Sequence, residues 1–461
     1  MAAEAELNLN HVPPEVVEKI IKYLDLNTIK SLRLTSKVFG ERCLGPRFKS
    51  FLKQQTTDLT EQSLWSLCTL ASHPELGPAV KNLTIMATVY DASKLERILS
   101  TKKRRIVESS GPFARKEERE ALSNESVIDS LASALRLLGR LDSVDLDATV
   151  VQGPNVTVST ATGEWHPIWI LASQVYCLTM SAVARSGVAV DTVTVYRNTP
   201  RCSVPSCDIT AHVEKLDAGH LTFAGTSIKN LALSISTKVE TDFHKITAAR
   251  ERLEGADRAF HEVFGSKAGL LEASNPEALA EENFLGIARL LRLMPKLEAI
   301  DLHLYDTLEG DAKAYDQIFK AIAREVHLPS LEQCFLRGIY ASEESMLQFL
   351  ENHPRINHLD LREMTITSGS WEPIFKYLGS RMTALTRLRL SNLRDENKSL
   401  RNLNPVWEEG SGAADYSSSY PCGGGLMVHT REFDVDDFKK GLSSNHVRLV
   451  VRWGRPSSVA G

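Results

Sequence analysis

The sequence predicts an α/β protein in which a small N-terminal bundle of three helices precedes a long, irregular array of helix–strand units. Two observations lead to this fold class. Apolar residues recur at helical spacing between Pro13 and Phe39. Later in the chain, short strands with apolar residues at their first, fourth and sixth positions repeatedly follow amphipathic helices. At 461 residues, 43% of them hydrophobic, the chain is long enough for such an array.

The first predicted helix carries more apolar surface than one small core needs. Pro13, Pro14 and Glu15 are typical of a helix start. The apolar residues that follow cover more than half of the helix girth: Val16, Val17, Ile20, Ile21 and Leu24. Because a bundle of this size cannot bury two apolar faces, we expect the surplus face to dock on a partner.

Two further helices are predicted directly after the first. The second contains Leu26, Ile29, Leu32 and Leu34 at helical spacing. Thr35 or Ser36 is suited to cap a third helix, which carries Val38 and Phe39.

These residues resemble the F-box motif. The matching positions are Leu9, Val12, Pro13, Glu15, Val16, Ile20, Ile21, Leu24, Leu26, Ile29, Leu32, Lys37 and Phe39. Two of them depart from the family, since Val12 replaces the usual Leu and Phe39 the usual Trp. The resemblance implies that residues 1–50 form a three-helix F-box that docks on the adaptor Skp1 and, through it, on a cullin. The residues implied to contact Skp1 are Pro13, Glu15, Val16, Ile20, Leu24, Leu26, Ile29 and Leu32. The alternative is an ordinary N-terminal helical hairpin of a larger domain.

After a helical linker expected over 51–78, residues 79–461 are predicted to form the array. The clearest strand anchors are Leu297-Ile300-Leu302, Leu331-Cys334-Leu336, Ile356-Leu359-Leu361 and Leu385-Leu388-Leu390. The helices predicted before them are 284–293, 315–326, 345–351 and 371–378. Fainter copies are Val80-Leu83-Ile85, Leu141-Val144-Leu146 and Ile228-Leu231-Leu233. A further unit of unusual length is predicted from a helix over 165–184 and a strand over 190–196.

The repeated unit resembles the degenerate leucine-rich repeats found behind many F-box segments. It implies a leucine-rich-repeat-like α/β solenoid that binds a protein substrate. Disordered insertions are expected near 100–120 and 410–425, and a last strand over 447–453. A mixed α/β domain whose anchors coincide by chance is the alternative.

The strand period also predicts which residues face away from the helices. If the anchors point inward, the alternate residues point to the opposite face of the sheet. Toward the end of the chain these residues are basic or aromatic, and we expect Phe335, Arg337, Arg362, Arg387 and Arg389 to bind the substrate. Arginine binds carboxylate and phosphate bidentately, so an acidic or phosphorylated segment is the expected ligand. A merely solvated face is the alternative.

Composition argues against several other classes of protein. The net charge of −4 favours neither nucleic acid nor an anionic membrane as partner. No apolar run approaches the length of a membrane span, and seven cysteines, an odd number, are typical of reduced thiols. We therefore expect a soluble protein of the cytoplasm, the nucleus or both. Lys102–Arg105 fits either a nuclear-import signal or a solvated charged run.

We find no positive signal for catalysis or for a cofactor. Cys202, Cys207, His212 and His220 do not have the close pairwise spacing of common zinc ligands, so no metal is expected. Phosphate-binding, dinucleotide-binding and nucleophile-elbow motifs are missing from the sequence. The favoured interpretation is a non-catalytic substrate receptor of an SCF-type ubiquitin ligase. Its alternatives are a leucine-rich-repeat scaffold outside a ligase and an enzyme with a site in 165–220.

Overall fold

The computed structural model describes eleven stretches of the chain: residues 12–90, 123–151, 157–158, 166–199, 202–216, 225–236, 282–304, 315–391, 393–395, 398–399 and 430–434. Several predicted features lie outside them: the insertions near 100–120 and 410–425, the basic run Lys102–Arg105, His220 and the strand over 447–453.

Short helices form the N-terminal bundle. They are α1 (Pro14–Ile21), α2 (Leu26–Thr35), α3 (Lys37–Arg42) and, after the three expected ones, α4 (Pro46–Leu52). The Thr28 amide donates to Asp25 Oδ1 at 2.7 Å at the start of α2. The Phe39 amide donates to Ser36 Oγ at 3.2 Å at the start of α3. Ser36 is therefore the cap that separates the second and third helices.

A parallel sheet forms the body, and its strands are neighbours in chain order. The strands of its parallel path are β1 (Gln54–Thr57), β2 (Asn82–Tyr90), β3 (Arg140–Val151), β5 (Ala189–Val195), β7 (Asn230–Ser236), β8 (Ala299–Leu304), β9 (Gln333–Arg337), β11 (His358–Arg362) and β13 (Arg387–Ser391). Two short strands, β4 (Thr157–Val158) and β6 (Val204–Pro205), pair with β3 and β7.

A helix lies between each pair of successive strands on this path. The helices are α5 (Glu61–Ser72), α9 (Asn124–Leu138), α10 (His166–Ser186), α11 (Ser206–Leu216), α15 (Glu282–Arg292), α16 (Asp316–Glu325), α17 (Glu343–Asn352) and α18 (Trp371–Ser380). The four helices predicted between 284 and 378 are confirmed, as are the helix and strand predicted between 165 and 196.

The predicted strand anchors lie side by side in the sheet. One ladder of paired residues runs Leu83, Val144, Val193, Leu231, Ile300, Cys334, Leu359, Leu388. A second runs Ile85, Leu146, Val195, Leu233, Leu302, Leu336, Leu361, Leu390. All of these side chains are buried in one continuous core with the helices. The two-residue period of a strand therefore places the same face of every unit against the helices.

Residues 51–78, expected to be a helical linker, contain the helix α5 and also the first strand of the sheet. Gln54 is in register with Asn82 and Thr57 with Ile85, so β1 is a parallel neighbour of β2. The side chains of Leu64 and Leu67 on α5 join the same core. The strand escaped prediction because its sequence, QQTT, has no apolar anchor and lies between two helices.

Additional strands occur at the C-terminal end of the described chain. A small second sheet consists of β10 (Tyr340–Ala341), β12 (Thr365–Ile366), β14 (Arg394–Asp395) and β15 (Lys398–Ser399). One more strand, β16 (Thr430–Asp434), pairs antiparallel with β13 and is the last strand on the path of the large sheet. It stands at this edge of the described sheet, and the strand expected over 447–453 lies outside the described residues.

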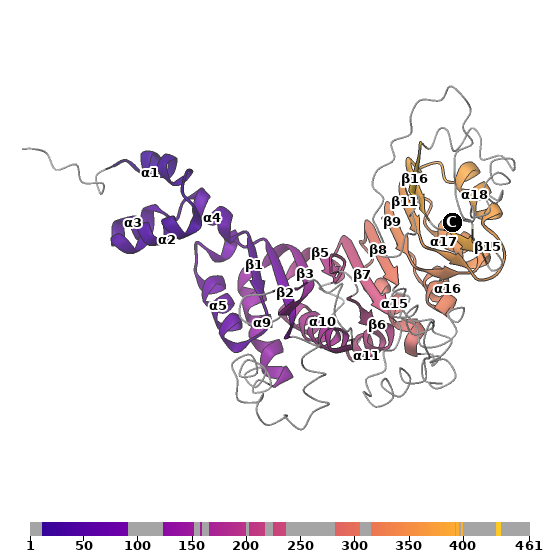
Figure 1. Ribbon diagram of the computed structural model, residues 1–461, viewed down its shortest axis with the longest axis horizontal. Coiled ribbons are helices and arrows are strands. Elements are labelled where there is room, and N and C mark those ends of the chain that lie inside the picture. The colour runs from indigo at the N-terminus through magenta and orange to yellow at the C-terminus, as the bar shows by residue number, and fades with distance from the viewer. Residues whose placement is uncertain are drawn as a thin grey trace, which may run out of the picture.

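The molecule is curved, with its strands and helices on opposite sides. Figure 1 shows the strands on the inner side of the curve, the helices on its outer side, and the N-terminal bundle at one end. We call the side of the sheet that faces away from the helices the open face. Among the described residues, no helix has the length and apolarity needed to cross a membrane.

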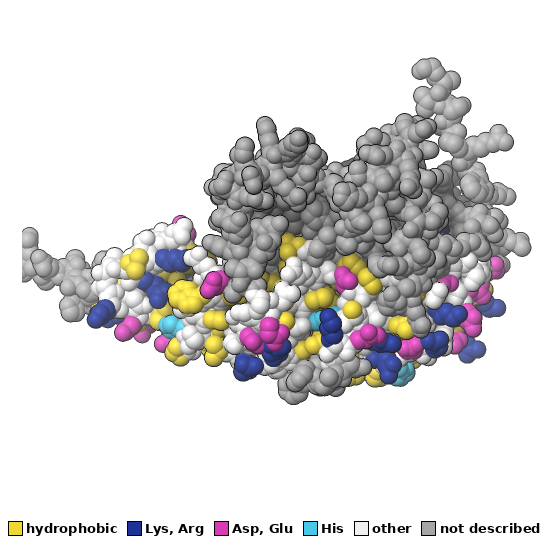
Figure 2. Space-filling model, turned by 90° about the horizontal axis from the view of Figure 1, so that it is seen from below, with side chains coloured by type: hydrophobic (Ala, Val, Ile, Leu, Met, Phe, Trp, Pro, Cys, Tyr) yellow, Lys and Arg dark blue, Asp and Glu magenta, His cyan; other side chains and the backbone are white. Residues whose placement is uncertain are grey.

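Charges on the helix side are mixed and mutually paired. Figure 2 views this side and shows acidic and basic side chains interspersed among its described residues. Ion pairs link neighbouring helices: Arg185 of α10 with Glu125 of α9 at 2.7 Å, and Arg292 of α15 with Glu325 of α16 at 3.9 Å. This side therefore offers little charge of a single sign.

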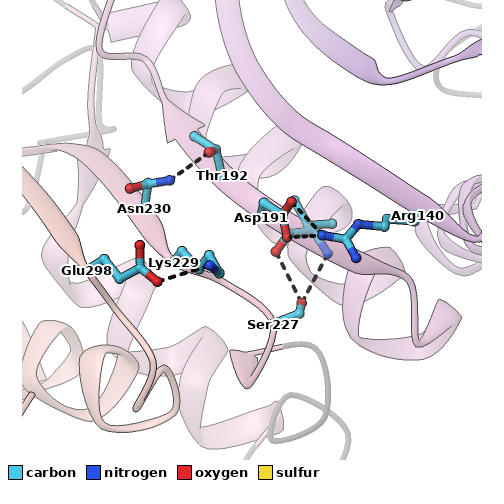
Figure 3. A network of polar contacts seen from close by, with 8 residues as sticks. Arg140, Asp191, Thr192, Ser227, Lys229, Asn230 and Glu298 are labelled. Atoms are coloured by element: carbon cyan, nitrogen blue, oxygen red, sulfur yellow. Dashed lines mark hydrogen bonds and ion pairs between the residues drawn. The ribbon is translucent and has the colours of Figure 1, made fainter. Parts of the chain in front are cut away.

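Polar contacts also join successive units where their strands begin (Figure 3). Arg140 Nη2 contacts both carboxylate oxygens of Asp191, at 3.0 and 2.8 Å, and Lys229 pairs with Glu298 at 3.0 Å. The Lys229 amide donates to the Asp191 carbonyl at 2.9 Å, and the Glu298 amide to the Lys229 carbonyl at 2.7 Å. These bonds fix the register of each unit against the one before it.

Candidate partner-docking surfaces

Helix α1 divides its apolar residues between two faces. Val17 and Ile21, four residues apart, are buried in the core of the bundle. Val16 and Ile20 remain 43% and 46% exposed. With Pro13, which is also exposed, they form a stripe that helical spacing continues to Tyr23, 91% exposed. We call Pro13, Val16, Ile20 and Tyr23 the apolar stripe. Such a stripe beside a closed core is the surplus face that the sequence predicts.

The bundle closes its core without the apolar stripe. Its buried side chains are Val17, Ile21, Ile29, Phe39, Cys43, Phe48 and Leu76. The guanidinium of Arg33 lies over the ring of Phe48, 4.4 Å from its centroid, and so covers one side of this core. Glu18 Oε1 accepts a hydrogen bond from the Arg47 amide at 3.1 Å, where a carboxylate favours the start of α4. The stripe is therefore not needed to complete the fold of the bundle.

The eight residues expected to contact Skp1 fall into three groups. Pro13, Glu15, Val16 and Ile20 are exposed. Leu24, Leu26 and Leu32 are partly buried and pack against the bundle core. Ile29 is completely enclosed and supports the core of the bundle, and its expected contact with Skp1 stays a prediction.

Three further apolar residues of the bundle are exposed, although the motif did not single them out. Tyr23 continues the apolar stripe beyond α1, and Leu34 near the end of α2 is 88% exposed. Val38 on α3 is also exposed. Leu34 and Val38 are visible in the sequence as apolar residues of their helices, but spacing alone does not show that their side chains stay outside the core.

The bundle is packed against the body. Leu76, which precedes β2, is buried in the bundle core, and Leu70 of α5 packs against the same cluster. Lys49 of α4 pairs with Glu75 at 3.4 Å. The N-terminal bundle and the first unit of the sheet therefore share one apolar cluster.

The five residues expected to bind substrate lie together on the open face. Cα register places Phe335 beside Asp360, and Asp360 beside Arg389. It also pairs Arg337 with Arg362, and His358 with Arg387. The ring of Phe335 meets the imidazole of His358 edge-on, with centroids 4.8 Å apart. The sequence therefore predicted the common face of these five residues, and the pairing brings them onto three adjacent strands.

Two of the expected arginines are engaged by carboxylates of the chain itself. Arg362 Nε donates to Asp360 Oδ1 at 2.7 Å, and its Nη2 donates to Oδ2. Arg337 donates to both carboxylate oxygens of Glu363, at 3.1 and 3.2 Å. These bidentate pairs reduce the capacity of Arg337 and Arg362 to take an external anion.

Arg387 and Arg389 present a different situation. Arg387 is exposed and Arg389 is half-buried, and neither forms an ion pair with another described side chain. The antiparallel register of β16 places position 434 opposite Arg387 and position 432 opposite Arg389. The residues at these positions are Asp434 and Glu432. An acidic segment of the chain thus stands in register beside the two arginines.

Elsewhere on the open face, a partly buried charge network joins two units that are not neighbours in the sheet. Arg197, after β5, donates to the carboxylate of Asp301 on β8. Burial raises the pKa of Asp301, while the charges of Arg197 and Arg362 act in the opposite direction. Burial also lowers the pKa of His303 to about 3, with Arg337 and Arg197 adding to the effect. His303 is therefore neutral at physiological pH. The opposite charges of Arg197 and Asp301 offset each other within the network.

The alternative sites weighed from the sequence gain little from the structure. Among the described residues, no three His, Cys, Asp or Glu side chains come together as metal ligands. Tyr176 and His212 meet edge-on at 5.6 Å, but both are buried in the core. Burial lowers the pKa of His212 to about 4. Tyr176 and His212 are thus enclosed and not presented to a substrate.

Comparison with protein families agrees with the N-terminal geometry. Residues 9–51 match the F-box domain. The match spans α1 to α4 almost completely and includes the apolar stripe. No curated protein matches the chain. The chain therefore contains an N-terminal F-box domain, followed by a mixed α/β body with a parallel sheet.

Proposed function

We propose that this chain is the substrate-recognition subunit of an SCF-type ubiquitin ligase. The F-box domain docks on Skp1, which links the chain to a cullin, and the open face holds a target protein. One observation carries the proposal: the segment that matches the F-box domain has a closed core and leaves its apolar stripe exposed. F-box domains generally bind Skp1.

The proposed role needs no bond chemistry from this chain. A receptor that binds a ligase core at one end and a target at the other turns ubiquitin transfer into a reaction between tethered partners. The gain comes from a raised effective concentration. The body supplies the distance between the two surfaces, since the F-box domain precedes β1 and the expected substrate residues lie on β9 to β13.

Skp1 docking is driven by burial of the apolar stripe. Complete burial of an aliphatic side chain contributes about 1.5 to 3 kcal/mol, and Val16 and Ile20 still expose nearly half of their surface. An aspartate in the stripe would have to leave water without a partner, which costs more than the lost contact. Charge at these two positions should therefore remove binding.

The test is recovery of Skp1 with the purified full-length chain carrying Val16→Asp and Ile20→Asp. We expect Skp1 to be lost from this double variant. Leu137→Asp is the matched control, because Leu137 is also an exposed apolar residue, 55% exposed on α9 of the body. The control should recover Skp1 as the wild type does. Full Skp1 recovery by the folded double variant would refute docking through the stripe.

Cullin recovery separates the ligase subunit from the competing interpretation. A ligase receptor should bring down a cullin together with Skp1. Recovery of Skp1 with no cullin would favour a protein-interaction scaffold that works outside a ligase.

We propose further that the body is a leucine-rich-repeat-like solenoid whose open face binds the substrate through Phe335, Arg337, Arg362, Arg387 and Arg389. Support comes from the two anchor ladders and from the helix in each unit. Arginine and aromatic side chains often dominate binding energy at interfaces. Since Arg337 and Arg362 are held by Glu363 and Asp360, Arg387 and Arg389 are the main anion-binding groups.

This substrate assignment has its own test. The variant Arg387→Glu with Arg389→Glu should lose at least one copurifying protein while Skp1 recovery stays unchanged. An identical set of copurifying proteins would rule out these arginines as the recognition site.

A further inference from the structure

Strand β16 differs from every other long strand of the sheet. On the main path of the sheet, the strands from β1 to β13 are parallel and each follows a helix, whereas β16 is antiparallel. Residues 392–429 separate it from β13 in the sequence. Antiparallel neighbours are usually joined by loops of roughly two to five residues. A strand that returns over so long a connection is not a simple hairpin extension of β13.

An external peptide would also fit at the position of β16. Without it, β13 would be the last strand of the sheet, with an outer row of unpaired backbone groups. Extended peptides bind such edges by adding a strand, using backbone hydrogen bonds for affinity and alternate side chains for specificity. In this structure the edge is taken by the chain's own residues Thr430–Asp434.

Along this edge, acidic positions of β16 are opposite basic residues that β13 presents on the open face. Positions 432 and 434 are opposite Arg389 and Arg387, and directly opposed residues share one face of a sheet. Both are acidic, Glu432 and Asp434. The intervening position, Phe433, is opposite Leu388 of the buried anchor ladder. In sequence and register, the segment therefore alternates acidic residues opposite the two arginines with an apolar residue opposite a core anchor.

We propose that Thr430–Asp434 is an intramolecular pseudo-ligand that occupies the binding edge of β13. The external partner that it mimics is an extended acidic segment of a protein, which displaces β16 and adds antiparallel to β13. The inference rests on the proposed function for the claim that this partner is a substrate. The occupancy of the edge by β16 does not depend on that claim.

The experiment uses the full-length chain and a fluorescent peptide with its own residues 428–438, VHTREFDVDDF. In the release variant, Glu432→Lys with Asp434→Lys, the positions in register with Arg389 and Arg387 become basic, so like charges oppose each other and β16 should detach. Peptide binding, measured by fluorescence anisotropy, should then be about tenfold tighter than in the wild type. The matched control is Glu344→Lys with Glu351→Lys, which makes the same charge change at exposed positions of α17 and should bind as the wild type does.

Two additions identify the site of the peptide. Adding Arg387→Glu and Arg389→Glu to the release variant should abolish the gain. A peptide with lysine in place of both acids should not bind the release variant, whose Arg387 and Arg389 are intact. Equal peptide affinity of wild type and release variant, or a gain that survives the arginine changes, would overturn the proposal.

Hydrogen exchange provides an independent measurement. Amides of 430–434 should be protected in the wild type and lose protection in the release variant. Protection that persists in the release variant would show that the charges do not hold the strand, and would overturn the proposal. Skp1 recovery should be equal in all variants. If the wild type did not bind Skp1, the proposed function would be refuted. The peptide result would still decide this inference.

Discussion

Neighbouring residues of α1 have opposite tasks, because a step of one residue turns the side chain by about 100°. Ile21 is completely buried, whereas Ile20 is 46% exposed. Sequence pattern alone assigns both to one broad apolar surface. The structure separates a residue that holds the bundle together from one that is available to a partner.

This separation predicts different effects of two adjacent substitutions. Ile21→Ala should leave a cavity and lower the free energy of unfolding by about 2 to 5 kcal/mol. Ile20→Asp should change it by no more than about 0.5 kcal/mol, because exposed substitutions are usually nearly neutral. Urea unfolding of both variants measures the difference. Equal destabilisation would mean that Ile20 also belongs to the core.

A buried histidine makes the body sensitive to acid. His353 Nε2 accepts from the Leu328 amide at 3.2 Å, so Nδ1 carries the proton and donates to the Phe349 carbonyl at 2.7 Å. Burial lowers the pKa of His353 to about 4. The folded form therefore holds the neutral ring at pH values where the unfolded chain, with a pKa near 6.5, already binds a proton.

The sign of the resulting pH dependence follows from this difference. Stability is fully present above about pH 6.5 and falls as the pH decreases toward 4, because the unfolded state takes up the proton first. Between pH 7.5 and pH 5 the contribution of His353 should amount to a loss of about 2 kcal/mol. Urea unfolding of wild type and His353→Gln at both pH values tests this. The variant should lose about 2 kcal/mol less, and an equal loss would contradict the assignment.

At the scale of single elements, each strand contributes one face to the core and one to the open face. Leu361 lies in a buried anchor ladder, and Arg387 lies on the open face of the next strand. Leu361→Ala should therefore cost about 2 to 5 kcal/mol, whereas Arg387→Ala should cost about 0.5 kcal/mol or less. Thermal unfolding measures both. Skp1 recovery should be normal in each variant, and its loss in Leu361→Ala would mean that F-box docking depends on this distant unit.

The turns after the strands also restrict which residue can stand at a given position. Gly338 follows β9 with a φ of 68°, and a Cβ there would lie 2.1 Å from the Leu304 carbonyl oxygen. Glu363 occupies the corresponding place after β11 with a φ of 54°. Glycine is thus required after β9 for space as well as for backbone conformation.

Substitution of Gly338 should lower the free energy of unfolding markedly, even when only one methyl group is added. We expect Gly338→Ala to lower the free energy of unfolding by more than about 1 kcal/mol, since left-handed strain and a steric clash add. Thermal unfolding measures it. An unchanged melting temperature would show that the turn relaxes without cost.

For the whole molecule, much of the architecture follows from apolar spacing alone. The anchors from Leu83 to Leu390 were predicted because the same buried face recurs in every unit. The apolar excess of α1 likewise predicted an exposed face. Both signals come from local periodicity, which the sequence carries directly.

The remaining features depend on contacts between segments that are far apart in the sequence. β1 has no apolar anchor, and only its pairing with β2 makes it a strand. β16 takes its place through register with β13, which no local pattern encodes. The pairing of Arg362 with Asp360 was visible as two nearby charges, yet its bidentate geometry was not. The sequence pattern therefore did not reveal that Arg337 and Arg362 are held by carboxylates of the chain itself.

The central claim, that the F-box domain docks through the exposed side of α1, is tested most directly by hydrogen–deuterium exchange of the full-length chain with and without purified Skp1. Added Skp1 should increase protection within residues 12–42, most strongly in α1, and leave the amides of β9 to β13 unchanged. A complex that forms without added protection in 12–42, or that protects the body instead, would contradict the account.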